Sequence, residues 1–195
     1  MGPIRGKVGP IVIYTWKGQC VIRSLPKKIS KAPSQKRLDN RKKMSACQEW
    51  LMYITPFVRI GFKNYSAKQH GFGNALSYLK LNAMNEDLEV DPAKALISWG
   101  NLPQSISPAV SNRTPMKLQI TWEAVPGDKD RAMVLAYDGK GTAIGEVCGP
   151  RRSEGKLVLA CKGTEGKEMH VYLSFVSQER DRFSTSVYLG IVKLK

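Results

Sequence analysis

The sequence lacks the apolar run of about 20 residues that a membrane-spanning helix needs. Its first residues, MGPIRGKVGP, also lack the unbroken apolar core of a signal peptide. We therefore expect no membrane partner, and a location in the cytoplasm or in a virion or other leaderless particle. An apolar content of 42% is ordinary for a globular chain and excludes an intrinsically disordered one.

The motifs of common enzyme classes are missing as well. There is no GxSxG nucleophile elbow, no phosphate-binding GxxxxGK[ST] and no zinc-binding HExxH. The stretch GKGTAIG contains GxG, but it lies between two predicted strands, which indicates a turn. The two histidines, His70 and His170, have no catalytic partner nearby in the sequence. We expect a binding or structural protein with no enzymatic activity and no cofactor.

Cysteine pairs of the CxxC type are absent, and the two histidines are far apart, so we predict no metal site. The four cysteines are interpreted as small buried hydrophobic residues. An alternative concerns Cys148 and Cys161, which could face each other on neighbouring strands and form a disulfide in an oxidising setting.

Acidic residues are nearly absent from the first 85 residues, which contain only Asp39 and Glu49. Sixteen Lys and Arg residues oppose these two, a balance of +14, whereas residues 86–195 hold 15 cations and 14 acids, a balance of +1. This asymmetry is typical of a polyanion-binding half joined to a neutral half. The alternative is a basic surface that only keeps the protein soluble.

What the first half does contain is a predicted β-hairpin, GKVGPIVIYTWKGQCVIRSLPKK, at residues 6–28. Its first strand is apolar on both faces, with Ile11, Ile13 and Thr15 opposite Val12, Tyr14 and Trp16. One interpretation places this strand in the core, between a long helix and the C-terminal domain. The other makes it an assembly device that pairs with another subunit. Its interface would then comprise Ile11, Ile13, Tyr14 and Trp16.

Beyond the hairpin the apolar period changes to three and four residues, which predicts an amphipathic helix beginning near Ser34. Thr55-Pro56 should kink or restart this helix. The segment HGFGN follows, as a hinge or an anion-binding helix start, and Asn74 should cap a short second helix. The periodic apolar positions of the long helix are Met44, Cys47, Leu51, Ile54 and Val58.

The predicted start of the long helix, SQKRLDNRKK, is crowded with cations. A helix N-terminus carries partial positive charge, so each cation there is disfavoured by a few tenths of a kcal/mol. An external anion would relieve this frustration, although the alternative is a solvated helix end screened by salt.

The acidic segment 85–92 precedes a run of short predicted strands, so we expect a boundary between domains 1–90 and 91–195. The clearest strand is MKLQITWEA, in which apolar Met116, Leu118, Ile120 and Trp122 alternate with polar residues. Seven strands in about 100 residues predict a β-sandwich. The other candidates are KALISW, RAMVLAYD, GTAIGEVC, KLVLAC, MHVYLSFV and SVYLGIVKL.

Two stretches of this half, LQITWEAVPGDKDRAMVLAYDGKG and MHVYLSFVSQERDRFSTSVYLG, resemble a fibronectin type III domain. The resemblance implies core positions for Trp122 and Tyr137, and it departs from the family in its weak proline signature and in an early strand interrupted by NLPQSISPAVSNRTP. The whole chain, with GKVG, WKG, RSLP and IGFK, also resembles an uncharacterised family of Bacteroidota proteins. This second resemblance supports architecture and implies no activity. The predicted fold is an α+β module, a hairpin plus two helices, followed by a fibronectin-type-III-like sandwich.

We predict sequence-independent binding of nucleic acid by the basic half, with DNA favoured over RNA. Cations would meet phosphates while Trp16 stacks on a base. The alternative is a structural subunit of a self-assembling filament, virion or tail-like particle, in which the basic half packs on an acidic protein surface and the chain forms a homo-oligomer or polymer. The expected nucleic-acid contacts are Arg5, Lys7, Trp16, Lys17, Arg23, Lys27, Lys28, Lys36, Arg37, Arg41, Lys42 and Lys43.

Overall fold

The computed structural model describes residues 5–16, 18–27, 32–112, 114 and 116–194. The chain divides into two compact units, Met1–Gln35 and Lys36–Lys195. The sequence places a boundary after residue 90 instead. The prediction groups the helices with the N-terminal strands, whereas the structure groups them with the C-terminal strands. The helices and the C-terminal strands share one hydrophobic core. Within the described residues, no helix is both long and apolar enough to cross a membrane.

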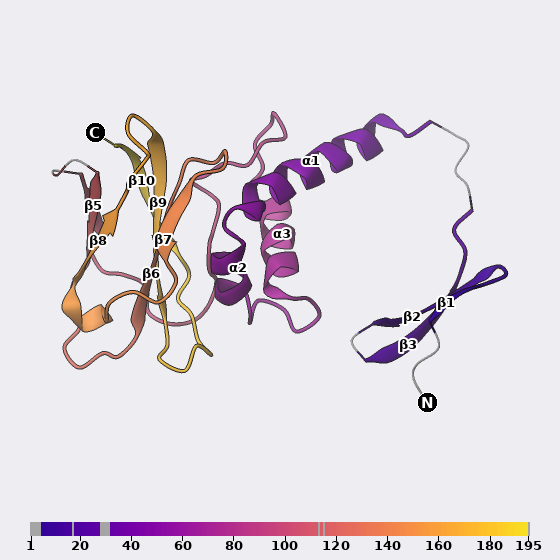
Figure 1. Cartoon of the computed structure of the whole chain (residues 1–195), viewed down its shortest axis with the longest axis horizontal. Coiled ribbons are helices and arrows are strands. Elements are labelled where there is room, and N and C mark those ends of the chain that lie inside the picture. The colour runs from indigo at the N-terminus through magenta and orange to yellow at the C-terminus, as the bar shows by residue number, and fades with distance from the viewer. Residues whose placement is uncertain (1–4, 17, 28–31, 113, 115, 195) are drawn as a thin grey trace. The chain divides into compact units, whose positions relative to one another are not determined.

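The first unit is a three-stranded antiparallel sheet in the order β1 (Gly6–Val8), β2 (Ile11–Trp16) and β3 (Gln19–Ser24) (Figure 1). The predicted hairpin is β2 and β3, and β1 is an additional strand on the other side of β2. Gly9 and Gly18 stand in the two turns with φ of 56° and 79°, a left-handed conformation that favours glycine. Both belong to the short motifs GKVG and WKG, so these motifs encode the turns of the sheet.

Three helices begin the second unit: α1 (Gln35–Met52), α2 (Thr55–Gly61) and α3 (Gly71–Asn82). Pro56 lies in the first turn of α2, so the chain restarts at this point. The predicted cap by Asn74 is wrong, because Asn74 is buried inside α3. Its side-chain amide donates to the carbonyl oxygens of Phe62 (2.9 Å) and Ser66 (3.1 Å) and thereby ties α3 to the loop before it.

The C-terminal strands form a sandwich of two antiparallel sheets, in the orders β4-β5-β8 and β10-β9-β6-β7. Most predicted strands are present, but KALISW is not a strand. Its backbone instead meets a serine-rich segment, where Ile97 N donates to Ser186 Oγ (3.0 Å) and Ser98 Oγ donates to Ser184 O (2.7 Å). The strand bounds are β4 (Ala109–Ser111), β5 (Lys117–Thr121), β6 (Arg131–Tyr137), β7 (Ala143–Glu146), β8 (Lys156–Ala160), β9 (Glu168–Val176) and β10 (Val187–Lys193), with a 3-10 turn at Arg152–Glu154.

The four-stranded sheet is the middle of three layers, because its other face is covered by the helices (Figure 1). Along β6, the side chains of Ala132, Val134 and Ala136 pack in the cluster between the two sheets. The alternate side chains, Met133, Leu135 and Tyr137, pack instead with helix residues. The buried residues opposite them include Cys47, Trp50 and Leu51 of α1, Ile54 between α1 and α2, and Phe57 and Val58 of α2.

The predicted sandwich core is confirmed for Leu118, Ile120 and Trp122, which are buried, but not for Met116, which is exposed. All four cysteines are free thiols, so Cys148 and Cys161 do not form the disulfide considered above. The two cysteines follow β7 and β8 respectively, and these strands belong to different sheets.

Candidate nucleic-acid interface

The small N-terminal sheet has two faces of different chemistry, which are set by its register. Ile13 of β2 pairs with Ile22 of β3, and Val12 pairs with Arg23. Paired residues of an antiparallel sheet point to the same side. We call the first side the aliphatic face and define it by Val8, Ile11, Ile13 and Ile22. We call the second side the aromatic face and define it by Lys7, Val12, Tyr14, Trp16, Val21 and Arg23.

The aromatic face combines ring surface with positive charge. Arg23 lies over the ring of Tyr14, with 5.4 Å from its Cζ atom to the ring centroid. Together with Val12 and Trp16, these two residues line a pocket of about 520 Å³. Trp16 is 57% exposed, which leaves most of its indole free for contact. An exposed ring beside a guanidinium can stack on a flat ligand while the cation meets an anionic group.

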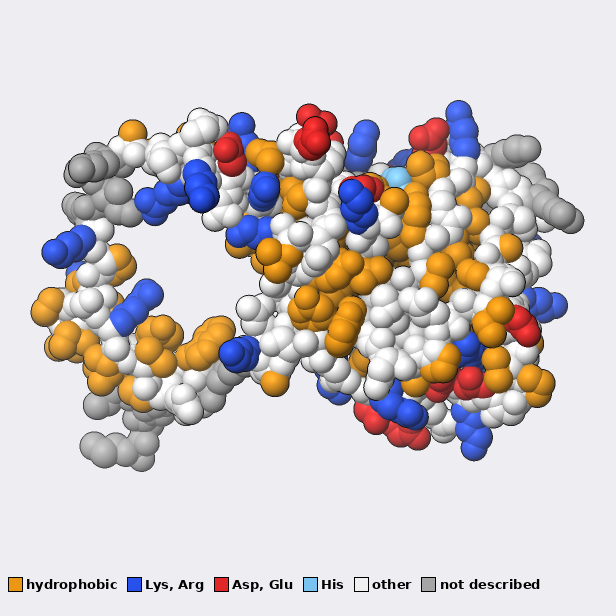
Figure 2. Space-filling model, turned by 180° about the vertical axis from the view of Figure 1, so that it is seen from behind, with side chains coloured by type: hydrophobic (Ala, Val, Ile, Leu, Met, Phe, Trp, Pro, Cys, Tyr) orange, Lys and Arg blue, Asp and Glu red, His pale blue; other side chains and the backbone are white. Residues whose placement is uncertain are grey.

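Charge around this face is of one sign. Residues 1–35 contain seven Lys and Arg residues and no Asp or Glu. Figure 2 shows blue and orange side chains over this unit, without red. Among the described residues of the sheet none is buried. The predicted contacts Arg5, Lys7, Arg23 and Lys27 are exposed here, whereas Lys17 and Lys28 lie outside the described residues.

The remaining predicted cations lie in the second unit, on the first turns of α1, which project beyond α2 and α3 (Figure 1). The first turn of α1 contains no acidic residue, so the expected conflict with the helix dipole is present. Arg37 and Arg41, one helical turn apart, form a like-charged pair on one side of the helix. Lys36, Arg37, Arg41 and Lys42 are exposed, and Lys43 is half-buried.

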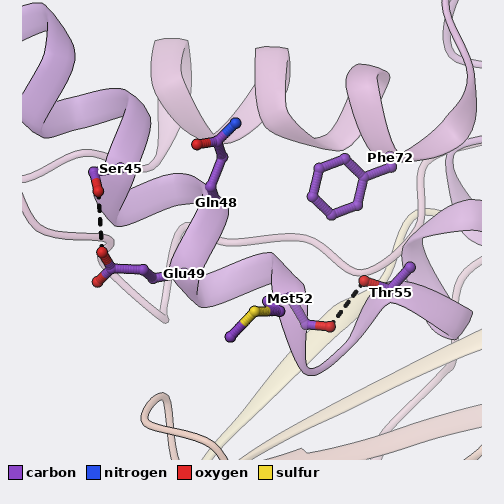
Figure 3. Close-up of a pocket in the computed structure, with 6 residues that line it drawn as sticks. All are labelled: Ser45, Gln48, Glu49, Met52, Thr55 and Phe72. Atoms are coloured by element: carbon purple, nitrogen blue, oxygen red, sulfur yellow. Dashed lines mark hydrogen bonds between the residues drawn. The ribbon is translucent and has the colours of Figure 1, made fainter.

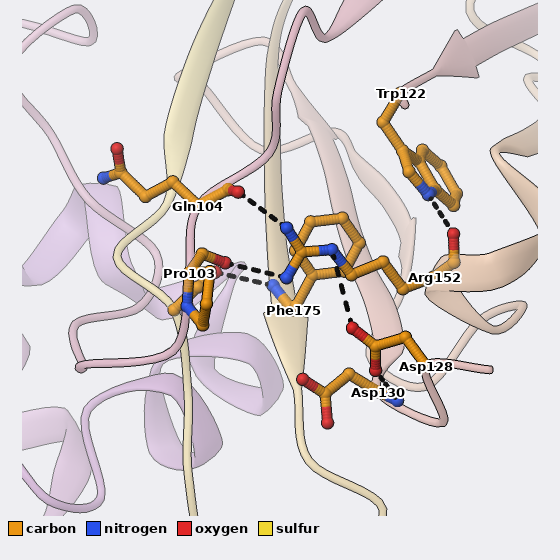
Figure 4. A network of polar contacts seen from close by, with 8 residues as sticks. Pro103, Gln104, Trp122, Asp128, Asp130, Arg152 and Phe175 are labelled. Carbon is orange, nitrogen blue, oxygen red and sulfur yellow. Dashed lines mark hydrogen bonds and ion pairs between the residues drawn. The ribbon is translucent and has the colours of Figure 1, made fainter. Parts of the chain in front are cut away.

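One cation that the sequence did not single out has a structural role. Arg152 is 3% exposed and lies over the ring of Phe175, with its Cζ atom 4.4 Å from the centroid. Its two terminal nitrogens donate to Pro103 O (3.0 Å) and Gln104 O (2.8 Å). Its Nε atom is 3.8 Å from Asp128 Oδ2 (Figure 4). These contacts fasten the segment before β4 to the sandwich, so Arg152 is not available to an external anion.

The structure also surrounds His170 with carboxylates that are distant in sequence. A pocket of about 450 Å³ is lined by His170, Trp50, Glu89, Asp91 and Asp138, among others. Burial lowers the pKa of His170, although the nearby carboxylates oppose this. Its Nδ1 atom is 2.8 Å from the hydroxyl of Tyr188. No signal in the sequence pointed to this pocket, because its walls meet only in the folded chain.

Two acids of this pocket, Asp138 and Asp91, have structural partners. Asp138 Oδ1 accepts hydrogen bonds from the backbone of Lys140, Gly141 and Thr142, each at 2.9 Å. Burial opposes its ionisation, but these hydrogen bonds outweigh burial and lower its pKa. Asp91 accepts from Ala93 N at 2.9 Å. Within the described residues, no group of three or more His, Cys, Asp or Glu could hold a metal ion.

A further hollow of about 440 Å³ lies where α1 meets α2 (Figure 3). Its polar groups are engaged: Ser45 Oγ donates to Glu49 Oε1 (3.0 Å), and Thr55 Oγ1 donates to Met52 O (2.8 Å). Phe72, from α3, forms part of the wall. The hydroxyl of Thr55 thus secures the joint between the two helices.

The fold defines the class of this protein. It is an antiparallel β-sandwich whose four-stranded sheet carries a helical layer, preceded in the sequence by a small basic sheet. The chain belongs to a family of unknown function (DUF6266), whose model matches residues 3–190. No curated protein matches the chain at a significant level.

A solved structure similar to part of the chain is the solution structure of the fn3 domain of the human collagen alpha-1(XX) chain. It is 17% identical, with a TM-score of 0.36, and the match covers 50% of this chain and 88% of that one.

Proposed function

We propose that this protein binds nucleic acid without sequence preference through the aromatic face of its N-terminal sheet. The observation that carries the proposal is the group of exposed Trp16, exposed Arg23 and half-buried Tyr14 in a unit without any acidic residue. Bases stack on aromatic rings whatever their identity, and phosphates attract cations regardless of sequence. DNA is the first nucleic acid to test, in single-stranded form, because an unpaired base has a free face for Trp16.

The expected strength follows from these two contributions. Stacking on one aromatic side chain is worth about 1–3 kcal/mol, so Trp16→Ala should weaken binding about 5- to 150-fold. If about six cations of the basic half engage phosphates, affinity should fall ~10³-fold between 50 and 200 mM salt.

Fluorescence anisotropy with a labelled single-stranded oligonucleotide measures both effects. Trp99→Ala is the matched control, because Trp99 is also exposed (41%) but belongs to the neutral second half of the sequence. We expect Trp99→Ala to bind like the wild type at every salt concentration. Equal affinities of wild type and Trp16→Ala, or a flat salt dependence, would contradict the proposal.

A further inference from the structure

The two cations of the aromatic face lie in one row across the N-terminal sheet. Lys7 of β1 and Arg23 of β3 both pair with Val12 of β2, so the three side chains point to the same side. Neighbouring strands are about 4.8 Å apart, which places the Cα atoms of the two cations roughly 10 Å from each other. Both cations are exposed, and their side chains are long enough for both to reach one phosphate group above Val12.

The side chain of Arg23 is held in a defined direction by Tyr14. Its Cζ atom lies 5.4 Å from the centroid of the Tyr14 ring. Tyr14 stands between Val12 and Trp16 on this side of β2, so the guanidinium leans from the cation row toward Trp16. A stacked guanidinium loses little freedom on binding and keeps its N–H edge open to a phosphate. It also covers the ring of Tyr14, so Trp16 is the ring of this face that remains open to a base.

The spacing between Trp16 and the guanidinium corresponds to the length of one nucleotide. Tyr14 and Trp16 are two residues apart in one strand, a distance of about 6.6 Å. In a nucleotide one ribose separates the base from its 5′-phosphate, and this span is comparable. A base on the indole of Trp16 therefore brings its own 5′-phosphate to the guanidinium of Arg23.

We infer that the aromatic face is a site for a single nucleoside 5′-phosphate, with the base stacked on Trp16 and the phosphate bound by Arg23 and Lys7. The inference rests on the proposed function and specifies the unit that is recognised. The face offers one open ring and one row of cations, so one nucleotide occupies it fully. Free mononucleotides are then ligands in their own right, and the other nucleotides of a longer strand add affinity only through the remaining positive charge.

The base and the phosphate should each contribute a measurable part of the affinity. An exposed ion pair is worth up to about fivefold in affinity, so two pairs are worth up to about 30-fold. We expect AMP to bind about 5- to 30-fold more tightly than adenosine at low salt. Ribose 5-phosphate, which lacks the base, should bind at least about fivefold more weakly than AMP. Near 1 M salt, where the Debye length falls to about 3 Å, AMP and adenosine should bind alike.

Two-dimensional ¹H–¹⁵N NMR of the full chain measures these affinities at the site itself. The indole N–H signal of Trp16 is identified by its loss in Trp16→Phe. Titration with AMP should shift this signal to saturation, whereas the indole of buried Trp122, which already donates to Arg152 O (2.8 Å), should keep its position. Equal affinities for AMP and adenosine at low salt, or a Trp16 signal that AMP does not move, overturn the inference.

Arg23→Gln tests the phosphate contact separately from stacking. We expect the variant to bind AMP about fivefold more weakly and adenosine as the wild type does. The Nε–H signal of Arg23, identified by its loss in this variant, should shift in the wild type with AMP but not with adenosine. The matched control is Lys117→Gln, which removes an exposed strand cation of the second unit and should leave both affinities unchanged. Equal effects of the two variants on AMP binding overturn the inference.

The oligonucleotide titration described above separates this inference from the proposed function. If the oligonucleotide binds and loses affinity in Trp16→Ala, but AMP does not bind, the site for a single nucleotide is refuted and the proposed function stands. If neither the oligonucleotide nor AMP binds, both are refuted. If both bind, AMP should displace the oligonucleotide from the wild type, because the two ligands share Trp16, and a lack of competition overturns the inference.

Discussion

Replacing the buried Arg152 by methionine should destabilise the sandwich strongly. The change removes two charge-assisted hydrogen bonds, to the carbonyl oxygens of Pro103 and Gln104, and the charge that faces Asp128. Methionine keeps an apolar stem over the ring of Phe175, so the loss is mainly electrostatic.

The magnitude follows from these contacts. Hydrogen bonds from a charged group contribute about 1.5–3 kcal/mol each. Removing one partner of a buried pair costs about 3–5 kcal/mol, because the other groups lose their compensation. The side chain of Asp128 is 21% exposed, so water can hydrate its carboxylate after Arg152 is removed. We expect a loss of stability in the upper half of the 3–5 kcal/mol range only if this hydration does not occur. For a unit of this size, 3–5 kcal/mol lowers the midpoint of thermal unfolding by about 6–20 °C.

Urea unfolding followed by tryptophan fluorescence measures the change in the free energy of unfolding. Arg151→Met is the matched control, since Arg151 is the preceding residue and is exposed, and we expect it to stay within about 0.5 kcal/mol of the wild type. If Arg152→Met also lies within 1 kcal/mol of the wild type, then other donors satisfy the two carbonyl groups and the reasoning is refuted.

Two further predictions concern the four-stranded sheet, at Gly145 in β7 and His170 in β9. Gly145→Ala should lower the free energy of unfolding by more than 2 kcal/mol, because a Cβ atom there would lie 2.1 Å from Val134 O and 2.9 Å from Phe57 Cζ. Gly73→Ala, in α3, meets only a flexible side chain and should be neutral or stabilising in the same urea titration; equal effects would contradict this. Burial lowers the pKa of His170 in the folded state, so the unfolded chain binds the proton of this imidazole more readily than the folded chain does. The stability contributed by His170 is therefore present above its unfolded pKa, near 6.5. It is lost as the pH falls through the lowered pKa of the folded state. His170→Gln should remove this loss of stability between about pH 7 and pH 5, and an unchanged slope would contradict it.

Much of this fold could be predicted because its signals are local. In β5 the alternation of Leu118 and Ile120 with polar neighbours identifies the buried side of one strand. In α1 the recurrence of Cys47 and Leu51 identifies the buried stripe of one helix. Turns marked by glycine identify where strands end. Each of these patterns depends on residues a few positions apart.

Which elements cover the two faces of the four-stranded sheet depends on contacts between residues far apart in the sequence, so local patterns could not predict it. The segment RAMVLAYD is apolar at successive positions, which signals burial on both faces. Nothing in that run says whether a second sheet, a helix or another chain provides the cover. The same limit applies to His170, whose carboxylate neighbours come from separate parts of the chain.

For the candidate interface, strand alternation predicts correctly that Ile11 and Ile13 face away from Tyr14 and Trp16. A single assembly surface made of all four residues therefore draws on both sides of the sheet. The position of Arg23 over Tyr14 depends on the register of β3 against β2. The register of two strands is set by the length and type of the turn between them, and the alternation of residues within one strand does not reveal it.

The double burial of the four-stranded sheet has a consequence for the cooperativity of unfolding. Met133, Leu135, Tyr137 and Tyr172 form a wall that is covered by the helices and by the segment that follows them. A fragment that begins after the helices would present this wall to water as one continuous apolar surface, of the kind that drives aggregation. The helices and the sandwich are therefore expected to unfold in one transition, and the sandwich without the helices is not expected to fold as an independent module.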